Sequence, residues 1–248
     1  MITKTEIDDL AAKYETIEFF NDDPVHFPNK FVNKKDKEIA GFIASLVAYG
    51  RREVFIKKLN QLFDIAENEP YNFIVNFEPE ILGDFNYRFG KPEDFAQIFT
   101  IMKKLYRENS SLEELFKYGY ENKINDNTFI PVTDYFYSHA QDNSAMGFRF
   151  MIPDARKGSA MKRMCMYLRW MVRKGPVDFG IWDFMPTSDL LIPLDTHVAR
   201  ISREMGLLTR NANDFKSVIE LTENLKQFDP NDPVKYDFAM FGYGVNNN

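Results

Sequence analysis

The sequence predicts an all-α fold, and three observations lead to that prediction. Apolar residues recur three and four positions apart over long stretches, which is the period of a helix buried on one face. The strict apolar/polar alternation of a half-buried strand is nowhere sustained. Glycine, proline and capping residues stand where the helical stripes begin or end. We therefore expect helices joined by loops, without a sheet.

The first clear stripe runs from Ile39 to Val47, preceded by Asp36 as the expected N-cap and followed by Gly50 as the stop. The residues 71–90 are rich in Phe, Asn and Pro, so short helices joined by loops are expected there. Further helices are predicted near residues 53–66, 92–106, 112–118 and 132–139.

The strongest helix prediction follows Gly158, where Ser159 is the expected N-cap of an apolar stripe that ends before Gly175. Another helix should begin with Asp195 or Thr196 as its cap and stop at Gly206. The last predicted helices cover residues 215–226 and 233–242.

Composition excludes several classes of protein. A chain of 248 residues with 44% hydrophobic and 15% aromatic residues has ample material for a packed core, which argues against disorder. Cys165 is the single cysteine, so an intramolecular disulfide, a four-cysteine zinc site and an iron–sulfur cluster are excluded, and no metal or cofactor is predicted. Residues 1–14 contain no long apolar run, so we expect a cytoplasmic protein without a membrane segment.

The charge distribution is uneven. A net charge of −6 is unusual for a protein that binds nucleic acid. However, residues 149–174 hold eight cations against one acid, and residues 30–58 hold eight cations against three acids. If these stretches meet in space, they form a basic face on an acidic body. The alternative is two solvated helix faces.

Two sequence runs resemble a known superfamily. Residues 193–200, PLDTHVAR, resemble the Val-Asp-Thr-His-Val-x-Arg signature of the helix-hairpin-helix (HhH-GPD) DNA glycosylases, and residues 158–162, GSAMK, resemble their Gly-x-Gly-x-Lys hairpin. The 33 residues from Lys162 to Asp195 are similar to the spacing in the archaeal 8-oxoguanine glycosylases. The whole chain most resembles an uncharacterised bacterial family. It departs from the superfamily at Ala160, in place of the second glycine, and at Gly50, where the superfamily has a glutamine wedge.

The resemblance implies a fold and a function. We expect two helical subdomains with a cleft between them, one formed by about 1–35 plus 190–248 and the other by about 36–189. The implied activity is a DNA N-glycosylase, with or without lyase activity, that excises an oxidised or otherwise damaged base from duplex DNA. Asp195 would be the catalytic carboxylate and Lys162 the nucleophile. The candidate DNA-binding residues are Arg51, Arg52, Arg156, Lys157, Gly158, Ser159, Arg163 and Arg200.

The chemistry explains why these residue types are needed. Breaking an N-glycosidic bond builds positive charge on the sugar, which a carboxylate can stabilise. A lysine can then attack the sugar if its amine is neutral, and the cations Lys157 and Arg163 favour that form of Lys162. An extruded base also needs aromatic faces in its pocket. The candidates, by position, are Phe148, Phe150, Trp170, Trp182 and His197.

Each functional interpretation has a structural alternative. Asp195 can be a helix cap that contributes about 1 kcal/mol, Lys162 a solvated lysine, and His197 a packed or capping residue. The alternative function is a non-catalytic nucleic-acid-binding protein of the same fold, and a helical scaffold for protein partners is a third. Retention of both Lys162 and Asp195 favours the enzyme, because a pure binder has no need of the pair.

Overall fold

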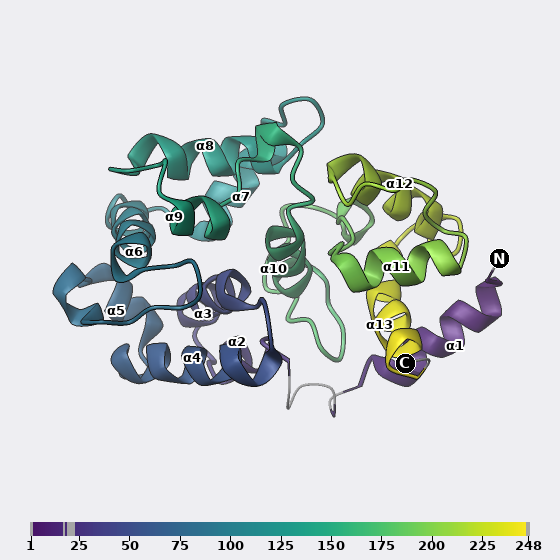
Figure 1. Ribbon diagram of the computed structural model, residues 1–248, viewed down its shortest axis with the longest axis horizontal. Coiled ribbons are helices and arrows are strands. Elements are labelled where there is room, and N and C mark those ends of the chain that lie inside the picture. Colours follow the sequence, from purple (N-terminus) through teal and green to yellow (C-terminus); the bar gives the residue numbers. More distant parts are fainter. Residues whose placement is uncertain (1, 17, 19–22, 247–248) are drawn as a thin grey trace. The chain divides into compact units, whose positions relative to one another are not determined.

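The computed structural model describes residues 2–16, 18 and 23–246, with side chains as far as residue 244. In these residues every regular element is a helix, and β pairing is confined to isolated bridges (Figure 1). The predicted all-α class is therefore confirmed. None of the helices in this described part of the chain is both long and apolar enough to cross a membrane.

The chain divides into two compact units, which we call the terminal unit and the central unit. The terminal unit comprises Met1–Asp23 and Gly158–Asn248, and the central unit comprises Pro24–Lys157. This partition differs from the expected one at both boundaries. Residues 24–35 join the central unit because helix α2 (His26–Asn29) packs on helix α3 (Lys34–Val47). Residues 158–189 join the terminal unit because helix α10 (Lys162–Val172) forms ion pairs there.

Helix α3 forms the core of the central unit. Every residue from Glu38 to Val47 is buried, and the helix packs against α2, α4, α5 and α7. Its N-cap is Asn33, whose side chain accepts from the amides of Lys35 and Asp36, so the predicted cap, Asp36, is wrong. The Asp36 carboxylate instead accepts from the Tyr71 amide at 2.8 Å, which joins the starts of α3 and α5.

The predicted helices of the central unit form close to their expected positions, whereas residues 146–151 form a short helix that was not predicted. The segment 71–90 consists of short helices and loops, as expected. The helices are α4 (Arg52–Ile65), α5 (Pro70–Val75), the 3-10 turn η2 (Pro79–Leu82), α6 (Pro92–Arg107), α7 (Leu112–Glu121), α8 (Phe129–His139), α9 (Met146–Met151) and the 3-10 turn η3 (Ala155–Lys157).

The terminal unit brings together the two ends of the chain. Helix α13 (Tyr236–Asn246) packs against both α1 (Lys4–Tyr14) and α11 (Thr196–Glu204), as Figure 1 shows. Helix α12 (Phe215–Lys226) covers the residues predicted for it. The 3-10 turns η4 (Thr187–Asp189) and η5 (Pro233–Lys235) complete the unit.

Helix α10 begins later than its sequence predicts. Met161, not Ser159, occupies the N-cap position, and its backbone is left-handed with φ +50°. The Ser159 hydroxyl accepts from the Met161 amide at 3.4 Å, so it stabilises the turn before the helix and caps no helical amide. The chain therefore reaches Lys162 through a tight turn, and Lys162 is the first residue of the helix.

Candidate active site

Lys162 and Asp195 lie together in the terminal unit. Lys162 is the first residue of α10, and Asp195 is the N-cap of α11. The Lys162 Nζ lies 3.7 Å from the Asp195 Oδ2, and the two side chains are 31% and 40% exposed. A small molecule or a nucleotide can therefore reach both groups. The structure brings together the two residues that the sequence singled out, although they lie 33 positions apart in the chain.

The two oxygens of Asp195 have different partners. Oδ1 accepts from the amides of His197 at 2.9 Å and Val198 at 2.8 Å, which confirms the predicted cap. These two bonds fix the plane of the carboxylate, and Oδ2 is the oxygen that faces Lys162. The N-terminal end of a helix carries partial positive charge and stabilises an anion. Asp195 therefore caps a helix with one oxygen and presents the other to Lys162.

A turn anchored on helix α12 positions Lys162. Gly158 has φ +75°, a conformation that favours glycine, and its carbonyl accepts from the Phe215 amide at 2.9 Å. Ser159 forms a β-bridge with Asp214, the N-cap of α12. The turn that resembles the glycosylase hairpin is thus attached to the start of another helix of the same unit. This attachment fixes the direction in which α10 begins.

Asp237 is a third ionisable group of this site, and it was not among the residues predicted from the sequence. It lies in the first turn of α13, and its carboxylate forms an ion pair with Arg169 of α10. Burial raises the pKa of Asp237 to about 6; Arg169 opposes this shift, the negative charge of Asp195 adds to it, and Lys162 lowers it. Asp237 is therefore within electrostatic reach of both candidate catalytic residues. In the sequence, Asp237 could have been noticed only as an acid within an otherwise apolar helix.

Two arginines of the basic stretch 149–174 are buried. The side chains of Arg169 and Arg173 are each 5% exposed, and both form ion pairs with Asp178, whose side chain is fully buried. Arg173 also pairs with Glu15 and Asp232. The apparent basic face of residues 149–174 is therefore reduced, because two of its eight cations neutralise acids inside the terminal unit.

The candidate DNA-binding residues are distributed over both units. Arg51 and Arg52 are exposed at the start of α4 in the central unit. Arg156 is exposed but forms an ion pair with Asp134, and Arg200 is exposed and pairs with Glu204 at 2.8 Å. Among the other predicted DNA contacts, Lys157 belongs to the central unit and lies 3.8 Å from Asp154. The remaining three belong to the terminal unit: Gly158, Ser159 and Arg163.

Burial changes the set of base-pocket candidates. Phe148, Trp170 and Trp182 are at most 2% exposed and belong to the hydrophobic cores, so they offer no free face to a base. Their aromatic character, read from the sequence alone, did not distinguish core from pocket. Phe150 and His197 are half-buried. His197 packs on α13, where a Cβ at Gly244 would lie 2.0 Å from its Nε2, which agrees with the packed alternative.

Comparison with known proteins gives a family but no activity. A family model described as "Protein of unknown function (DUF2400)" matches residues 23–246. No curated protein and no solved structure matches the chain. A function for this chain is therefore inferred from the geometry around Lys162 and Asp195.

Proposed function

The chain belongs to the family described as "Protein of unknown function (DUF2400)", and we propose that it is a DNA N-glycosylase that releases a damaged base. The observation that carries this proposal is the 3.7 Å separation of the Lys162 Nζ and the Asp195 Oδ2, at the starts of two helices. The helix-hairpin-helix glycosylase arrangement expected from the resemblance is part of the same proposal.

Asp195 acts on the first chemical step. When the bond between the base and the sugar C1′ breaks, its electron pair leaves with the base and positive charge develops on the sugar ring. A fixed carboxylate beside the ring stabilises that charge without having to reorganise. Because Oδ1 is held by two amides of α11, Oδ2 has the fixed orientation that this role requires.

Lys162 acts on the second step. Its neutral amine attacks C1′, a C1′–Nζ bond forms, and the amine gives up a proton for which Asp195 is a nearby acceptor. Opening of the sugar ring then yields a Schiff base between Lys162 and the DNA. Borohydride reduces such an intermediate to a stable amine, so the covalent complex can be detected by a shift in mass.

The test is borohydride trapping on duplexes that carry single lesions, with 8-oxoguanine first in the panel. We expect wild type to form the covalent complex and Lys162→Gln to form none, while duplex affinity changes little because one cation among many is removed. Lys174→Gln is the matched control, since Lys174 is exposed and follows the other end of α10. It should trap as well as wild type.

Release of the free base separates the roles of the two residues. Asp195→Asn should abolish release while its melting temperature stays close to that of wild type, because Asn caps a helix about as well as Asp. If wild type, Lys162→Gln and Asp195→Asn leave every lesion unchanged yet bind duplex equally, the glycosylase proposal is wrong. The non-catalytic binder then becomes the better description.

A further inference from the structure

The central unit presents a phenylalanine and an arginine at the tip of a tight hairpin. The backbone amides and carbonyls of Tyr87 and Gly90 exchange two hydrogen bonds, both 2.9 Å, so Arg88 and Phe89 form the two-residue tip. Arg88 is left-handed with φ +51°, and Phe89 is 45% exposed. A strained non-glycine residue beside an exposed aromatic ring is costly for a tip that only connects two helices.

Aromatic packing holds this tip in place. The Tyr49 hydroxyl donates to the Tyr87 carbonyl at 3.1 Å, and the Tyr87 hydroxyl donates to the Tyr49 carbonyl. Phe150 packs against both Tyr49 and Phe89 in tilted arrangements, with ring centroids 4.7 and 4.9 Å apart and interplanar angles of 57° and 51°. The Phe89 ring is thus supported from the protein side by Phe150, and the tip is preorganised.

Basic residues occur in the tip and directly after Gly50, which Arg88 contacts. The Arg88 guanidinium lies over the Tyr49 ring at 5.9 Å and in the space above Gly50, where a Cβ would be 2.2 Å from its Nη1. Gly50 therefore makes room for Arg88, and Arg51 and Arg52 follow it, both exposed. Residues 48–54 and 84–91 together contain four cations, the fourth being Lys91, against two acids, Glu53 and Asp84.

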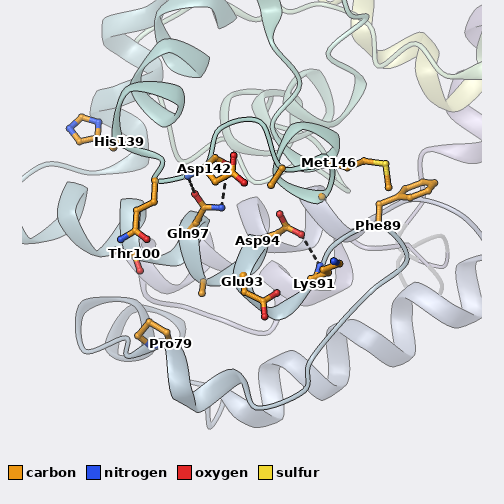
Figure 2. Close-up of a pocket in the computed structure, with 14 residues that line it drawn as sticks. Pro79, Phe89, Lys91, Glu93, Asp94, Gln97, Thr100, His139, Asp142 and Met146 are labelled. Carbon is orange, nitrogen blue, oxygen red and sulfur yellow. Dashed lines mark hydrogen bonds between the residues drawn. The ribbon is translucent and has the colours of Figure 1, made fainter.

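The apolar surface continues from Phe89 to Met146, which is 67% exposed. Both line a cavity of about 720 Å³ in the central unit and lie at the same end of it in Figure 2. The carboxylate of Asp94, which also faces this cavity, is occupied by the amides of Lys91 and Phe148. Among the described residues that line the cavity, the other acids are Glu93 and Asp142, and both are exposed.

We propose that the Arg88–Phe89 tip stacks on an unpaired nucleobase of DNA. An aromatic ring offers one flat face, and an adjacent guanidinium with neighbouring arginines provides charge for the phosphates on either side of the base. One ring and one methionine form too small a surface to anchor a membrane or bury a protein helix, whereas a single base matches their size. The inference rests on the proposed function only in taking DNA as the partner.

The test compares two duplexes that differ only in one unpaired base. Phe89→Ala should lower affinity for the duplex with the unpaired base about tenfold or more, the loss expected when one stack is removed, and affect the fully paired duplex much less. Tyr118→Ala is the matched control, because Tyr118 is an exposed aromatic (57%) on α7 of the same unit. It should leave both affinities unchanged.

Phe89→Trp provides a direct readout of stacking. It keeps an aromatic ring, so affinity should be retained, and its fluorescence should be quenched by the unpaired base but not by the paired duplex. The two native tryptophans are buried and contribute a constant background. Unquenched fluorescence, or equal losses of Phe89→Ala on both duplexes, overturns the proposal. Because these are binding measurements made with Lys162→Gln as the background, their outcome is independent of whether any base is released.

Discussion

At the scale of single residues, Asp195 shows how one side chain can satisfy a structural and a chemical requirement. One oxygen completes the first turn of α11, and the other faces an amine. The sequence was sufficient to predict both, since the cap position and the surrounding signature are local patterns. Asp237 could not be predicted in the same way, because its proximity to the site depends on how α13 packs on α11.

The raised pKa of Asp237 predicts a pH-dependent stability. Its value is about 6 in the folded protein against an ordinary 3.8, so between pH 4 and 6 the folded state holds a proton that the unfolded state has lost. The contribution of this group to stability is therefore fully present below about pH 4 and is lost as pH rises through 6. At about 1.4 kcal/mol per unit, wild type should lose about 3 kcal/mol relative to Asp237→Asn between pH 4 and pH 7, measured by urea unfolding.

Asp229→Asn is the control for that measurement. Burial of Asp229 is outweighed by the hydrogen bond and charge of Lys235, so its pKa is lowered and its titration lies below pH 4. The difference between wild type and this variant should stay constant from pH 4 to pH 7. A constant difference for Asp237→Asn over the same range would contradict the assignment.

The thiol of Cys165 should be unreactive in the folded protein. It is 1% exposed, and burial raises the pKa of its thiol far above the ordinary value, so the reactive thiolate is scarce. We expect no reaction with a thiol-specific chromogenic reagent under native conditions and one equivalent after unfolding in urea. Rapid labelling of the native protein would show that α10 opens far more readily than its packing indicates.

At the scale of the helix, α10 shows where local patterns succeed and fail. The apolar stripe from Met164 to Val172 is buried as expected. The predicted start of the helix was wrong because the left-handed backbone of Met161 turns the chain. Nothing in the sequence predicts a left-handed conformation at a methionine. The burial of Arg169 and Arg173 could not be predicted, because two of their acidic partners, Asp237 in α13 and Glu15 at the end of α1, lie far away along the chain.

Removal of Arg173 should be strongly destabilising. Its guanidinium pairs with Glu15, Asp178 and Asp232, and Arg173→Met would leave these acids without that partner in a buried setting. Breaking a buried ion pair from one side costs about 3–5 kcal/mol. Arg200→Met is the control, since the exposed pair of Arg200 with Glu204 contributes roughly 0.5 kcal/mol or less. Similar small losses in both variants, measured by urea unfolding, would contradict a structural role for the buried network.

At the scale of the whole molecule, the sequence predicted the helices better than their grouping. In long amphipathic helices such as α6 and α12 the local sequence itself marks where the helix begins and ends, so their ends were predicted within a residue or two. The partition into units depends on long-range contacts, such as that of α1 with α13, which no local pattern contains. For the same reason, burial of Trp170 and Trp182 could not be distinguished from exposure in a pocket.

The net charge of −6 makes the salt dependence of DNA binding the most informative property of the whole molecule. A protein with this charge can bind duplex only through locally concentrated cations, and the buried pairs of Arg169 and Arg173 remove two of them from contact with DNA. If about four phosphates are neutralised, the logarithm of the association constant should fall with the logarithm of salt concentration with a slope of about −4. Arg51→Ala should make that slope less negative by about 1, whereas Lys104→Gln, outside both basic stretches, should not change it. A slope near zero for wild type, or no binding at low salt, would contradict the glycosylase and the nucleic-acid binder alike, because both need phosphate contacts to hold the duplex.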